Sequence, residues 1–354
     1  MQDAHSIFNR LAQQFRAGTF TAEGNHLQDV APLQPTDIHE LPPTSSTPYK
    51  ELSERGHRAL VAGEVGAIIL AGGMATRFAY ERPKGLYPIL DGKSFLQLKI
   101  EWLLATAPQL PIYVMTSFRT DDEVRAHLAE HHFFGAAPDQ IQCFVQDQFP
   151  RLTPIGELFQ TDDLAEAYAA PGHGDFPTAL QRSGLLDRFL QGGGRYLYFS
   201  NVDNLGASLD PAIIGWHITC GCEMTIEVAQ KVAGDKGGAP ARVGSRIQLV
   251  EGFAFPPDFD QDAIPVFNTA SYVFTAAALR NPTELPWYVV EKKVGTTPVI
   301  QFEHLAGDLS RSLSVSLLAV DRDDRFIPVK SQADVPIAQR LIRRKLTRLA
   351  AKAI

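Results

Sequence analysis

The chain has 354 residues, of which 45% are apolar and 21% are charged, and its formal net charge is −7. These proportions are ordinary for a soluble globular protein, and the length allows one large domain or two smaller ones. The negative net charge provides no overall basic field for nucleic acid, so we expect local positive charge to meet any polyanionic partner. No stretch approaches the roughly 18 consecutive apolar residues of a membrane span.

The cysteines and the first residues of the chain indicate in which cellular compartment the protein is expected. Cys143, Cys220 and Cys222 are too few for a disulfide framework. Cys220 and Cys222 could bind a metal, but no matching Cys or His pair follows at a ligand spacing, so we expect cysteines of the core or of a helix end. The first residues lack the basic start and apolar core of a signal peptide, and we therefore expect a cytoplasmic protein.

Residues 1–60 resemble an appendage to the main part of the chain. Ser6–Arg16 predicts one helix. The segment Pro32–Pro48 holds five prolines among Ser and Thr, a composition typical of a linker. We therefore predict a helical and linker extension over residues 1–60 and one main domain over residues 61–354.

The most informative segment begins with Val65–Leu70, an apolar run without alternation that is typical of a strand buried on both faces. It leads into Gly72 and Gly73, whose backbone N–H groups can approach an anion closely. Arg77 and Lys84 add positive charge at the same place. The pattern predicts a site for a nucleoside triphosphate; the alternative is an ordinary strand-to-helix turn beside a salt bridge.

Two better-known phosphate loops do not fit this segment. Gly92-Lys93-Ser94 lacks the glycine of a Walker loop five residues earlier, where Tyr87 stands. The residues after Gly72 and Gly73 do not follow the Gly-x-Gly-x-x-Gly spacing of the dinucleotide fingerprint.

Helices and strands alternate along the rest of the chain. Ser94 can cap a helix, and Thr120–Glu123 is a capping box that predicts the start of another. Asp210-Pro211 and Gly221 are placed to bound a third helix, and Ser331–Ile354 predicts a closing basic amphipathic helix. Such alternation implies a three-layer α/β domain with its site at the carboxyl ends of the strands. Further strands are predicted over Pro111–Met115, Ile141–Val145, Tyr196–Ser200 and Glu223–Ala229.

Two polar clusters fall in loops past the third strand. Gln146 carries amide donors and an acceptor that suit the edge of a uracil ring, or it is a surface amide of a polar loop. Gly172-His173-Gly174-Asp175 places a histidine between two glycines at a helix N-terminus, which favours anions. The alternative for this histidine is a simple turn residue.

Two more clusters lie nearer the carboxy terminus. Asp203, within Asn201-Val202-Asp203-Asn204, follows a predicted strand and can hold Mg²⁺ against a triphosphate, or it caps the following turn. Lys330 follows an apolar segment and a proline, so it either points into a cleft or is a solvated lysine.

Taken together, these segments resemble one family, the UTP–glucose-1-phosphate uridylyltransferases, also called UDP-glucose pyrophosphorylases, which are related to the UDP-N-acetylhexosamine pyrophosphorylases. The resemblance spans roughly residues 63–330, and its most specific part runs from PGHGD to SNVDNLGA. The motifs in chain order are LAGG…PK from Leu70 to Lys84, YVMTSF from Tyr113, FVQDQFPR from Phe144, PGHGD from Pro171, SGLLD from Ser183, SNVDNLGA from Ser200, FNT from Phe267, VIQFE from Val299 and FIPVK from Phe326.

The resemblance implies a nucleotidyltransferase catalytic domain over residues 61–354, with a three-layer Rossmann-like, glycosyltransferase-A-like fold and a mixed central sheet. It also implies a Mg²⁺-dependent enzyme that makes UDP-glucose and pyrophosphate from UTP and glucose 1-phosphate.

The same resemblance implies roles for single residues. Those expected to bind the nucleotide are Leu70, Ala71, Gly72, Gly73, Lys84, Gln146, Gly172 and Asp203. Those expected to bind the sugar phosphate are His173, Asn201, Val202, Glu251 and Asn268. The residues expected to act in catalysis are Lys330, Lys84 and Arg77, and Asp203 is the expected ligand of Mg²⁺.

Three departures from the family pattern leave the sugar open. Ala75 stands where a glycine is usual, and Ala270-Ser271 replaces asparagines that usually follow FNT. Arg77 with Pro83-Lys84-Gly85 is more similar to the acetylhexosamine enzymes. The alternatives are therefore a UDP-N-acetylhexosamine pyrophosphorylase and a catalytically silent sugar-nucleotide sensor.

The resemblance also bears on assembly. Longer relatives associate through a carboxy-terminal β-helix, whereas this chain stops soon after Lys330. We therefore expect a monomer or weak dimer whose partners are UTP and a sugar 1-phosphate, with no nucleic acid or membrane.

Overall fold

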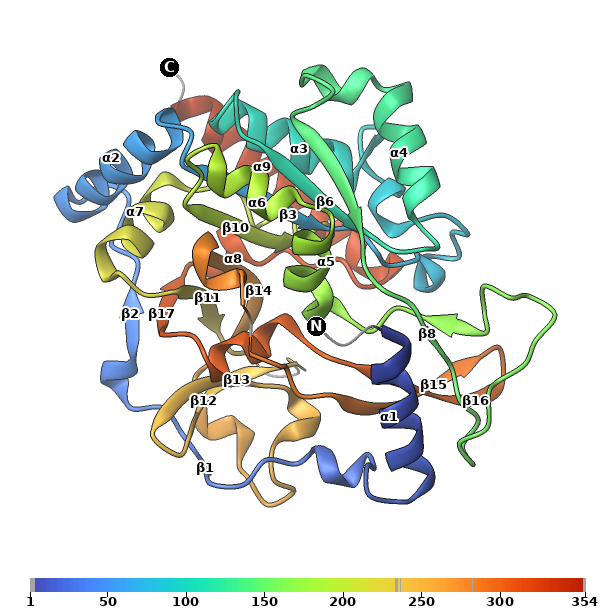
Figure 1. The fold of residues 1–354 in the computed structure, drawn as a ribbon. Coiled ribbons are helices and arrows are strands. Elements are labelled where there is room, and N and C mark those ends of the chain that lie inside the picture. Colours follow the sequence, from blue (N-terminus) through green and yellow to red (C-terminus); the bar gives the residue numbers. More distant parts are fainter. Residues whose placement is uncertain (1–3, 233–234, 236, 282, 353–354) are drawn as a thin grey trace.

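A mixed sheet of eight strands forms the centre of the fold (Figure 1). This computed structural model describes residues 4–352 except 233, 234, 236 and 282. From one edge to the other the strands are β2 (Ile38–Glu40), β17 (Val315–Val320), β11 (Met224–Gln230), β14 (Val266–Thr275), β10 (Tyr196–Asn201), β3 (Val65–Leu70), β6 (Ile112–Thr116) and β7 (Ile141–Val145). β14 runs antiparallel to both of its neighbours, whereas the other neighbouring pairs are parallel.

The strand β3 is buried on both faces, as its unbroken apolar run predicts. Successive side chains of a strand point to opposite faces of the sheet. Ala67 and Ile69 accordingly pack into one hydrophobic cluster, and Ile68 between them packs into a second cluster on the other face. The sheet therefore separates two cores.

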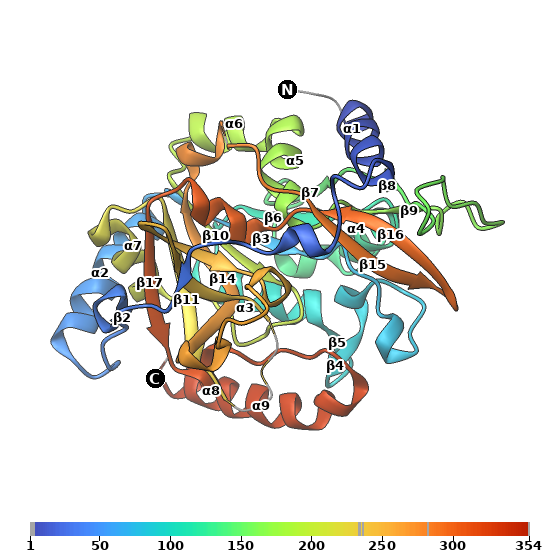
Figure 2. The same cartoon turned by 90° about the horizontal axis from the view of Figure 1, so that it is seen from below.

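Helices cover both faces of the sheet, which gives the three layers seen in Figure 2. One face packs against α2 (Thr47–Val61), α3 (Phe95–Thr106), α4 (Asp121–Glu130), α7 (Pro211–Cys220) and α9 (Val335–Lys352), and the other against α5 (Phe176–Arg182) and α6 (Leu185–Gln191). This architecture confirms the predicted three-layer α/β fold with a mixed central sheet.

Smaller elements surround the three layers. β1 (Val30–Ala31), β12 (Ala239–Val243) and β13 (Arg246–Val250) form a separate antiparallel sheet. The remaining paired strands are β4 (Pro88–Leu90) with β5 (Lys93–Ser94), β8 (Phe149–Pro150) with β9 (Tyr168–Ala169), and β15 (Tyr288–Val294) with β16 (Thr297–Glu303). The remaining helices are α1 (Ala4–Arg16) and α8 (Arg322–Arg325).

Several predicted helix ends are confirmed. The Ser94 hydroxyl accepts a hydrogen bond from the N–H of Gln97 at 3.1 Å and so caps α3. Asp210 caps α7 in the same way, and Gly221 (φ 64°) ends that helix in the left-handed conformation. The closing helix α9 begins later than predicted, and residues 353 and 354 lie outside the described part of the chain.

The predicted capping box at Thr120 is wrong. The helix α4 does begin at Asp121, but the Thr120 side chain makes no capping bond. Its hydroxyl instead accepts a hydrogen bond from the N–H of Ser117 at 3.0 Å, because the turn that enters the helix competes for the same oxygen.

The prediction of a linker between Pro32 and Pro48 is also wrong. That segment contains β2, which pairs in parallel with β17 and forms an edge of the central sheet. The helix α2 then crosses α7 so closely that a Cβ on Gly56 would lie 1.8 Å from the carbonyl oxygen of Pro211. The described residues before position 60 are therefore part of the main domain, because their backbone pairs and packs with it directly.

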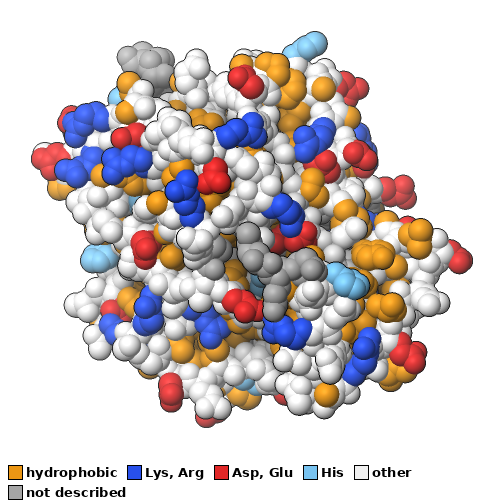
Figure 3. Space-filling view, in the orientation of Figure 1, with side chains coloured by type: hydrophobic (Ala, Val, Ile, Leu, Met, Phe, Trp, Pro, Cys, Tyr) orange, Lys and Arg blue, Asp and Glu red, His pale blue; other side chains and the backbone are white. Residues whose placement is uncertain are grey.

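Two further observations concern the charges on the surface and the composition of the helices. Figure 3 shows basic and acidic side chains interspersed on the face that it presents. Among the described residues we find no helix with both the length and the apolar composition needed to cross a membrane.

Candidate active site

The glycine loop after β3 folds back on itself. Met74 forms a bridge with Pro83, and the carbonyl of Gly73 accepts a hydrogen bond from the backbone N–H of Lys84 at 2.9 Å. The loop therefore returns Lys84 to the side of the two glycines. The Lys84 ammonium also lies 5.3 Å from the centre of the Phe78 ring.

Asp203 reaches this loop from the neighbouring strand. β10 and β3 run in parallel with Asn201 opposite Leu70, and the N–H of Val202 donates to the carbonyl of Leu70 at 3.1 Å. The Asp203 carboxylate then pairs with the ammonium of Lys84. The two side chains are 22% and 16% exposed, so their charges interact in surroundings less polar than bulk water.

Gln146 lies directly against the glycine loop. Its backbone N–H donates to Thr116 at the end of β6, and a Cβ on Gly72 would lie 2.2 Å from the Gln146 amide nitrogen. The absence of a side chain at position 72 is thus what allows this amide to approach. The hydroxyl of Ser117 donates to the carbonyl of Gly72 at 2.9 Å and fixes the loop from the same side.

The Gly172-His173-Gly174 segment packs against the backbone of His304. A Cβ on Gly172, whose φ is 91°, would lie 2.5 Å from the His304 carbonyl oxygen, so this position needs glycine for both conformation and space. The His173 Nδ1 accepts a hydrogen bond from the N–H of Ala306 at 2.9 Å. Burial lowers the pKa of His173, so the ring is neutral and carries its proton on Nε2, which is therefore a donor.

Asp175 joins two of these loops. Its carboxylate accepts a hydrogen bond from the backbone N–H of Asp147 at 2.6 Å, and Asp147 directly follows Gln146. Burial raises the pKa of Asp175 to about 7, and the nearby charge of Asp147 adds to that effect. The Gln146 loop is thus held to the Gly172 loop by a carboxyl group that titrates near neutrality.

A cavity of about 360 Å³ lies between these loops. The predicted site residues that line it are Leu70, Gly72, Gly73, Lys84, Gln146, Gly172, His173, Asn201, Val202 and Asp203. Met115 and Ala170 also line it. The sequence reasoning missed both, although Met115 lies near the end of a predicted parallel strand, where side chains of the site are expected to gather.

Five predicted site residues lie outside that lining. Ala71, expected to bind the nucleotide, is buried, and its N–H donates to the carbonyl of Met115 at 2.8 Å, so this N–H is not free to bind a phosphate. Arg77 is exposed in the turn after the glycines. The others are Glu251, Asn268 and Lys330.

Glu251 and Asn268 form a second group beside the cavity. The backbone N–H of Asn268 donates to the carbonyl of Gly238, and a Cβ on that glycine would lie 3.0 Å from a carboxylate oxygen of Glu251. Burial and then the charge of Glu303 raise the pKa of Glu251. Glu303 also lies against Gly172, so this group adjoins the His173 end of the cavity.

Ala270 has an unusual backbone. Its φ is 56°, and its N–H donates to the side-chain oxygen of Asn268 at 2.9 Å. A left-handed conformation favours glycine or asparagine over alanine. The asparagine that the family pattern leads one to expect at Ala270 would therefore relieve backbone strain as well as carry a polar side chain.

A buried lysine that the sequence reasoning missed holds the loop after β10. Lys99 on α3 is 1% exposed, and its ammonium donates to the carbonyls of Asn204 and Ala207 at 2.8 and 2.7 Å. Burial lowers the pKa of Lys99 well below its ordinary value. The carbonyls directly after Asp203 are thus fixed by a cation from beneath the loop.

Two further buried cations support the same loop. Lys345 on α9 donates to the carbonyls of Gly206 and Asp324, both at 2.6 Å, and burial lowers its pKa to about 7. Arg325 forms a two-pronged ion pair with Glu227 at 2.7 and 2.8 Å, and these side chains are 6% and 0% exposed. The closing helix is therefore tied to the loop that carries Asp203.

Lys330 follows a segment that is fixed to the same loop. Pro328 forms a bridge with Asn204, and the backbone N–H of Lys330 donates to the carboxylate of Asp334 at 2.8 Å. The Lys330 residue itself is exposed. The structure thus holds the backbone that leads to Lys330 close to the Asp203 loop.

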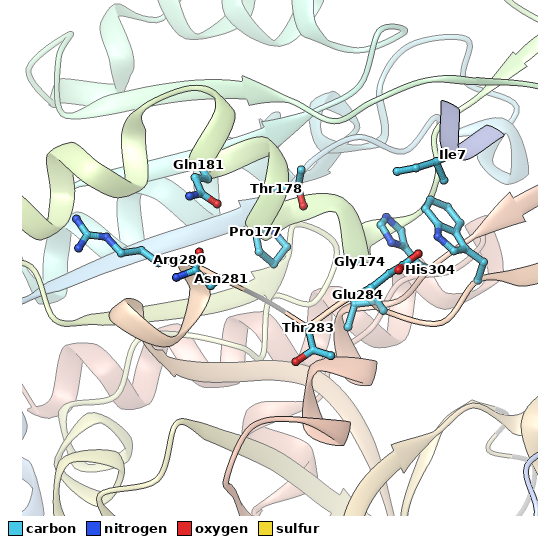
Figure 4. A pocket seen from close by; sticks show the side chains of 12 residues that line it. Ile7, Gly174, Pro177, Thr178, Gln181, Arg280, Asn281, Thr283, Glu284 and His304 are labelled. Carbon is cyan, nitrogen blue, oxygen red and sulfur yellow. The ribbon is translucent and has the colours of Figure 1, made fainter. Parts of the chain in front are cut away.

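A second cavity, of about 380 Å³, begins at Gly174 (Figure 4). Thr178 and Gln181 from α5 line it, as does the ring of His304, on which Trp287 stacks with 4.1 Å between ring centres. Its arginine, Arg280, is paired with Asp187. The smaller cavity combines the Gly72-Gly73 loop with Lys84 and Asp203, so it is the better candidate for a triphosphate.

The smaller cavity and its fold define a class of protein. A glycine loop, a cation and a carboxylate meet at the carboxyl edge of a mixed sheet, and an amide suited to a pyrimidine edge lies beside them. This is the arrangement expected of a nucleotidyltransferase.

The family model described as UTP–glucose-1-phosphate uridylyltransferase matches residues 13–349. The chain belongs to that family, which confirms the resemblance found in the motifs.

Curated relatives agree with this assignment. A UTP–glucose-1-phosphate uridylyltransferase of Musa acuminata is 27% identical over 96% of this chain and 77% of its own length. One of Pyrus pyrifolia is 28% identical over 90% of this chain and 70% of its own length.

Solved structures share the fold. A UDP-glucose phosphorylase from Trypanosoma brucei superposes with a TM-score of 0.77 at 24% identity, over 94% of this chain and 74% of that one. A uridine diphosphate N-acetylglucosamine pyrophosphorylase from the same organism gives 0.78 at 20% identity, over 94% and 75%. The likeness to both kinds of enzyme supports the fold and does not separate the two sugars.

Proposed function

We propose that the chain transfers the uridylyl group of UTP to a sugar 1-phosphate, with glucose 1-phosphate as the preferred acceptor, and releases pyrophosphate. The observation that carries this proposal is the ion pair of Lys84 and Asp203 beside Gly72 and Gly73. It places a cation, a carboxylate and open glycine backbone along one cavity, which are the groups that a triphosphate needs. The names of the curated relatives support the same reaction.

The reaction needs no dedicated base, because the phosphate of glucose 1-phosphate is already ionised. One of its oxygens bonds to the α-phosphorus of UTP, while the bond from that phosphorus to the β-bridging oxygen breaks and pyrophosphate leaves with the electron pair. Lys84 and Lys330 neutralise charge around the α-phosphate. Catalysis then comes from alignment and from charge neutralisation.

The remaining residues orient the two substrates in this proposal. Gln146 and the backbone at Gly172 contact uracil. The Nε2–H of His173 donates to the sugar phosphate, and Glu251 accepts hydroxyl groups of the sugar. Since the Asp175 carboxyl links the Gln146 and Gly172 loops, both uracil contacts are positioned together.

Asp203 fits a Mg²⁺ ion. One of its carboxylate oxygens faces Lys84, and within the described part of the chain the other has no hydrogen-bond partner. Mg²⁺ in nucleotide sites typically takes one or two protein carboxylates together with substrate phosphates. When bound, the ion would neutralise phosphate charge and lower the barrier to displacement.

Two alternatives are distinguished by one assay. A UDP-N-acetylhexosamine pyrophosphorylase is favoured by Arg77 with Pro83-Lys84-Gly85, and a silent sensor would need no catalytic cations. The assay measures the release of pyrophosphate from UTP, in the presence of Mg²⁺, with each of a panel of sugar 1-phosphates. We expect a higher kcat/KM for glucose 1-phosphate than for N-acetylglucosamine 1-phosphate. A reversed preference would overturn the choice of sugar, and no turnover with any acceptor would favour the sensor.

We further propose a cytoplasmic monomer or weak dimer that binds small molecules and neither nucleic acid nor membranes. A specific and stable interface usually buries about 1,200 Å² or more. Sedimentation at micromolar concentration tests the assembly state, and a stable larger oligomer would contradict this proposal.

A further inference from the structure

A cluster of nitrogen and sulfur ligands lies at the end of α7. One ring nitrogen of His217 and the sulfur atoms of Cys220 and Cys222 all lie within 4.8 Å of one another. His217 occupies the last turn of the helix, Cys220 is its last residue, and Gly221 turns the chain in the left-handed conformation. The turn therefore directs Cys222 back toward the helix that precedes it.

We propose that His217, Cys220 and Cys222 bind a thiophilic divalent cation, for which Zn²⁺ has the fitting geometry. The sulfur of Cys222 lies 3.8 Å from the Nδ1 of His217. Zinc binds thiolate at about 2.3 Å and imidazole at about 2.0 Å, so in a tetrahedral site these two ligands are about 3.5 Å apart. The histidine precedes the two cysteines in the sequence, so it is not among the residues that follow them at a ligand spacing.

Hydrogen bonds around His217 assign its tautomer. The hydroxyl of Thr275 donates to the carbonyl of Cys222 at 3.2 Å, so its oxygen accepts from the Nε2–H of His217, 3.1 Å away. The Nδ1 then carries a lone pair and accepts from the hydroxyl of Thr225 at 2.8 Å. Histidine ligands of metals almost always donate their other N–H to such a neighbour, which holds the ring in place.

Thr225 marks the point where the three ligands converge. Its hydroxyl oxygen lies 2.8 Å from the Nδ1 of His217, 3.3 Å from the sulfur of Cys222 and 4.0 Å from the sulfur of Cys220. Cys220 is exposed, so a solvent molecule can supply a fourth ligand. Three protein ligands and one open position are an established zinc arrangement.

The charges of the cluster suit a divalent cation. The backbone N–H of Cys222 donates to the sulfur of Cys220 at 3.4 Å. The Nδ1 of His217 accepts from the hydroxyl of Thr225, so the imidazole is neutral. Two thiolates, an imidazole and a divalent cation sum to zero charge, and the thiol protons are released to solvent on binding.

The cluster lies far along the sheet from the candidate active site. Thr275 at the end of β14 is paired with Tyr196 at the start of β10, whereas Asp203 follows the other end of β10. Figure 1 shows α7 beside α2, on the edge of the molecule away from α4. The metal would therefore join the end of α7 to β11 and β14 and take no part in uridylyl transfer.

The test uses the full chain, reduced and freed of metal by a chelator, and titrated with Co²⁺ as a spectroscopic substitute for Zn²⁺. We expect one Co²⁺ per chain, a near-ultraviolet thiolate-to-cobalt charge-transfer band, intense tetrahedral ligand-field bands, and displacement by Zn²⁺. Zinc should also raise the melting temperature of the wild-type chain. If no charge-transfer band forms with Co²⁺ in large excess, the proposal is wrong.

Variants assign the signal to the cluster. Cys220→Ser with Cys222→Ser should abolish the charge-transfer band and the zinc-dependent rise in melting temperature. Thr275→Val should weaken cobalt binding by roughly 10- to 100-fold, because it removes the partner that orients His217. Cys143→Ser is the matched control and should leave the spectrum unchanged. Survival of the band in the double serine variant would overturn the proposal.

A second potential metal cluster needs its own control. His127, Glu130 and His131 also lie close enough to share an ion and have no thiolate. His131→Gln should therefore leave the charge-transfer band unchanged. Uridylyltransferase activity of every variant serves as the check that it has folded.

Discussion

The side-chain oxygen of Asn204 accepts a hydrogen bond from the backbone N–H of Ile327 at 2.9 Å, and its amide donates to the carbonyl of Arg325 at 3.3 Å. Asn204 directly follows Asp203, and Ile327 lies in the segment that leads to Lys330. One buried amide thus sets the position of the segment that carries Lys330 relative to Asp203.

The first prediction concerns Lys330. If this lysine neutralises charge at the α-phosphate, its effect appears in the transition state and much less in ground-state affinity. Lys330→Ala should lower kcat by roughly a hundredfold or more, as expected for loss of one preorganised stabilising group. UTP binding should weaken far less, because Lys84 and the glycine loop remain. Steady-state kinetics and a direct binding titration measure the two effects.

The matched control for this experiment is Lys293→Ala, at an exposed lysine of β15 outside the site. It should keep the kcat of the wild type. Near-normal kcat in Lys330→Ala, with circular dichroism showing a folded chain, would make this lysine a solvated neighbour and refute its assigned role.

The second prediction concerns Lys345. Lys345→Met keeps the length of the side chain but leaves the carbonyls of Gly206 and Asp324 without their donor. The loop that carries Asp203 should then lose its fixed position, and misplacement by about 1 Å can reduce the rate about a hundredfold. We expect kcat to fall by roughly tenfold or more with a smaller change in KM. Arg344→Met, at the exposed neighbour on the same helix, should leave kcat unchanged.

The third prediction concerns Gly72 and Gln146. Because a Cβ at position 72 would lie 2.2 Å from the amide nitrogen of Gln146, Gly72→Ala must displace that amide. Loss of one hydrogen bond to the base should raise KM for UTP by roughly tenfold and reduce the preference for UTP over CTP. In the Gln146→Ala background the same change should add little. Fully additive effects in this double-mutant cycle would show that Gly72 acts independently of the amide.

The fourth prediction concerns pH. Burial raises the pKa of Asp175 from 3.8 to about 7, so the folded protein retains a proton that the unfolded chain loses. The resulting stabilisation is complete below the unfolded pKa and is lost as the pH rises through about 7. Asp175→Asn keeps an acceptor for the N–H of Asp147 and should remove this dependence.

Denaturant melts over a pH series test the Asp175 prediction. The unfolding free energy of Asp175→Asn relative to wild type should increase with pH by on the order of a few kcal/mol and level off above neutrality. Asp258→Asn, at an exposed carboxylate, is the control. A constant difference between Asp175→Asn and wild type across the series would contradict the buried, protonated carboxyl.

The fifth prediction concerns Ala270. Because its φ is 56°, Ala270→Gly should stabilise the protein by about 1 kcal/mol, and Ala270→Asn should also stabilise it. Ala126→Gly, in the exposed middle of α4, should instead destabilise by about 1 kcal/mol. Equilibrium unfolding measures all three, and a loss of stability in Ala270→Gly would mean that strain at this position is absent.

Local patterns explain what the sequence could predict. The apolar run of β3, the paired glycines and the caps Ser94 and Asp210 each depend on neighbouring residues, and all four appear in the structure as expected. Glu251 and Asn268 were identified through the family resemblance, because neither has a distinctive local pattern. The structure places them beside the cavity and outside its lining.

Features that depend on distant partners were missed. Lys99 lies in an otherwise apolar helix face, and nothing near it in sequence reveals that it will meet the carbonyls of Asn204 and Ala207. The strand β2 is short and lies among prolines, so only its pairing with β17 makes it a strand. Likewise, the N–H of Ala71 is consumed by Met115 on a neighbouring strand, a contact that no local motif encodes.

The antiparallel strand β14 has a consequence for how the chain reaches this fold. It lies between β10 and β11 in the sheet, yet it comes after both of these strands in the sequence. A growing chain that has reached only β13 can therefore form the parallel group β10, β3, β6 and β7, whose β10 edge exposes unpaired backbone groups, while β11 and β2 still lack their partners in the sheet. The sheet becomes continuous when β14 inserts, and its outer edge is completed later still, when β17 brings in β2 from near the amino terminus. Assembly of the sheet thus proceeds by late closure over long sequence separations, which is the slow route for a β-structure.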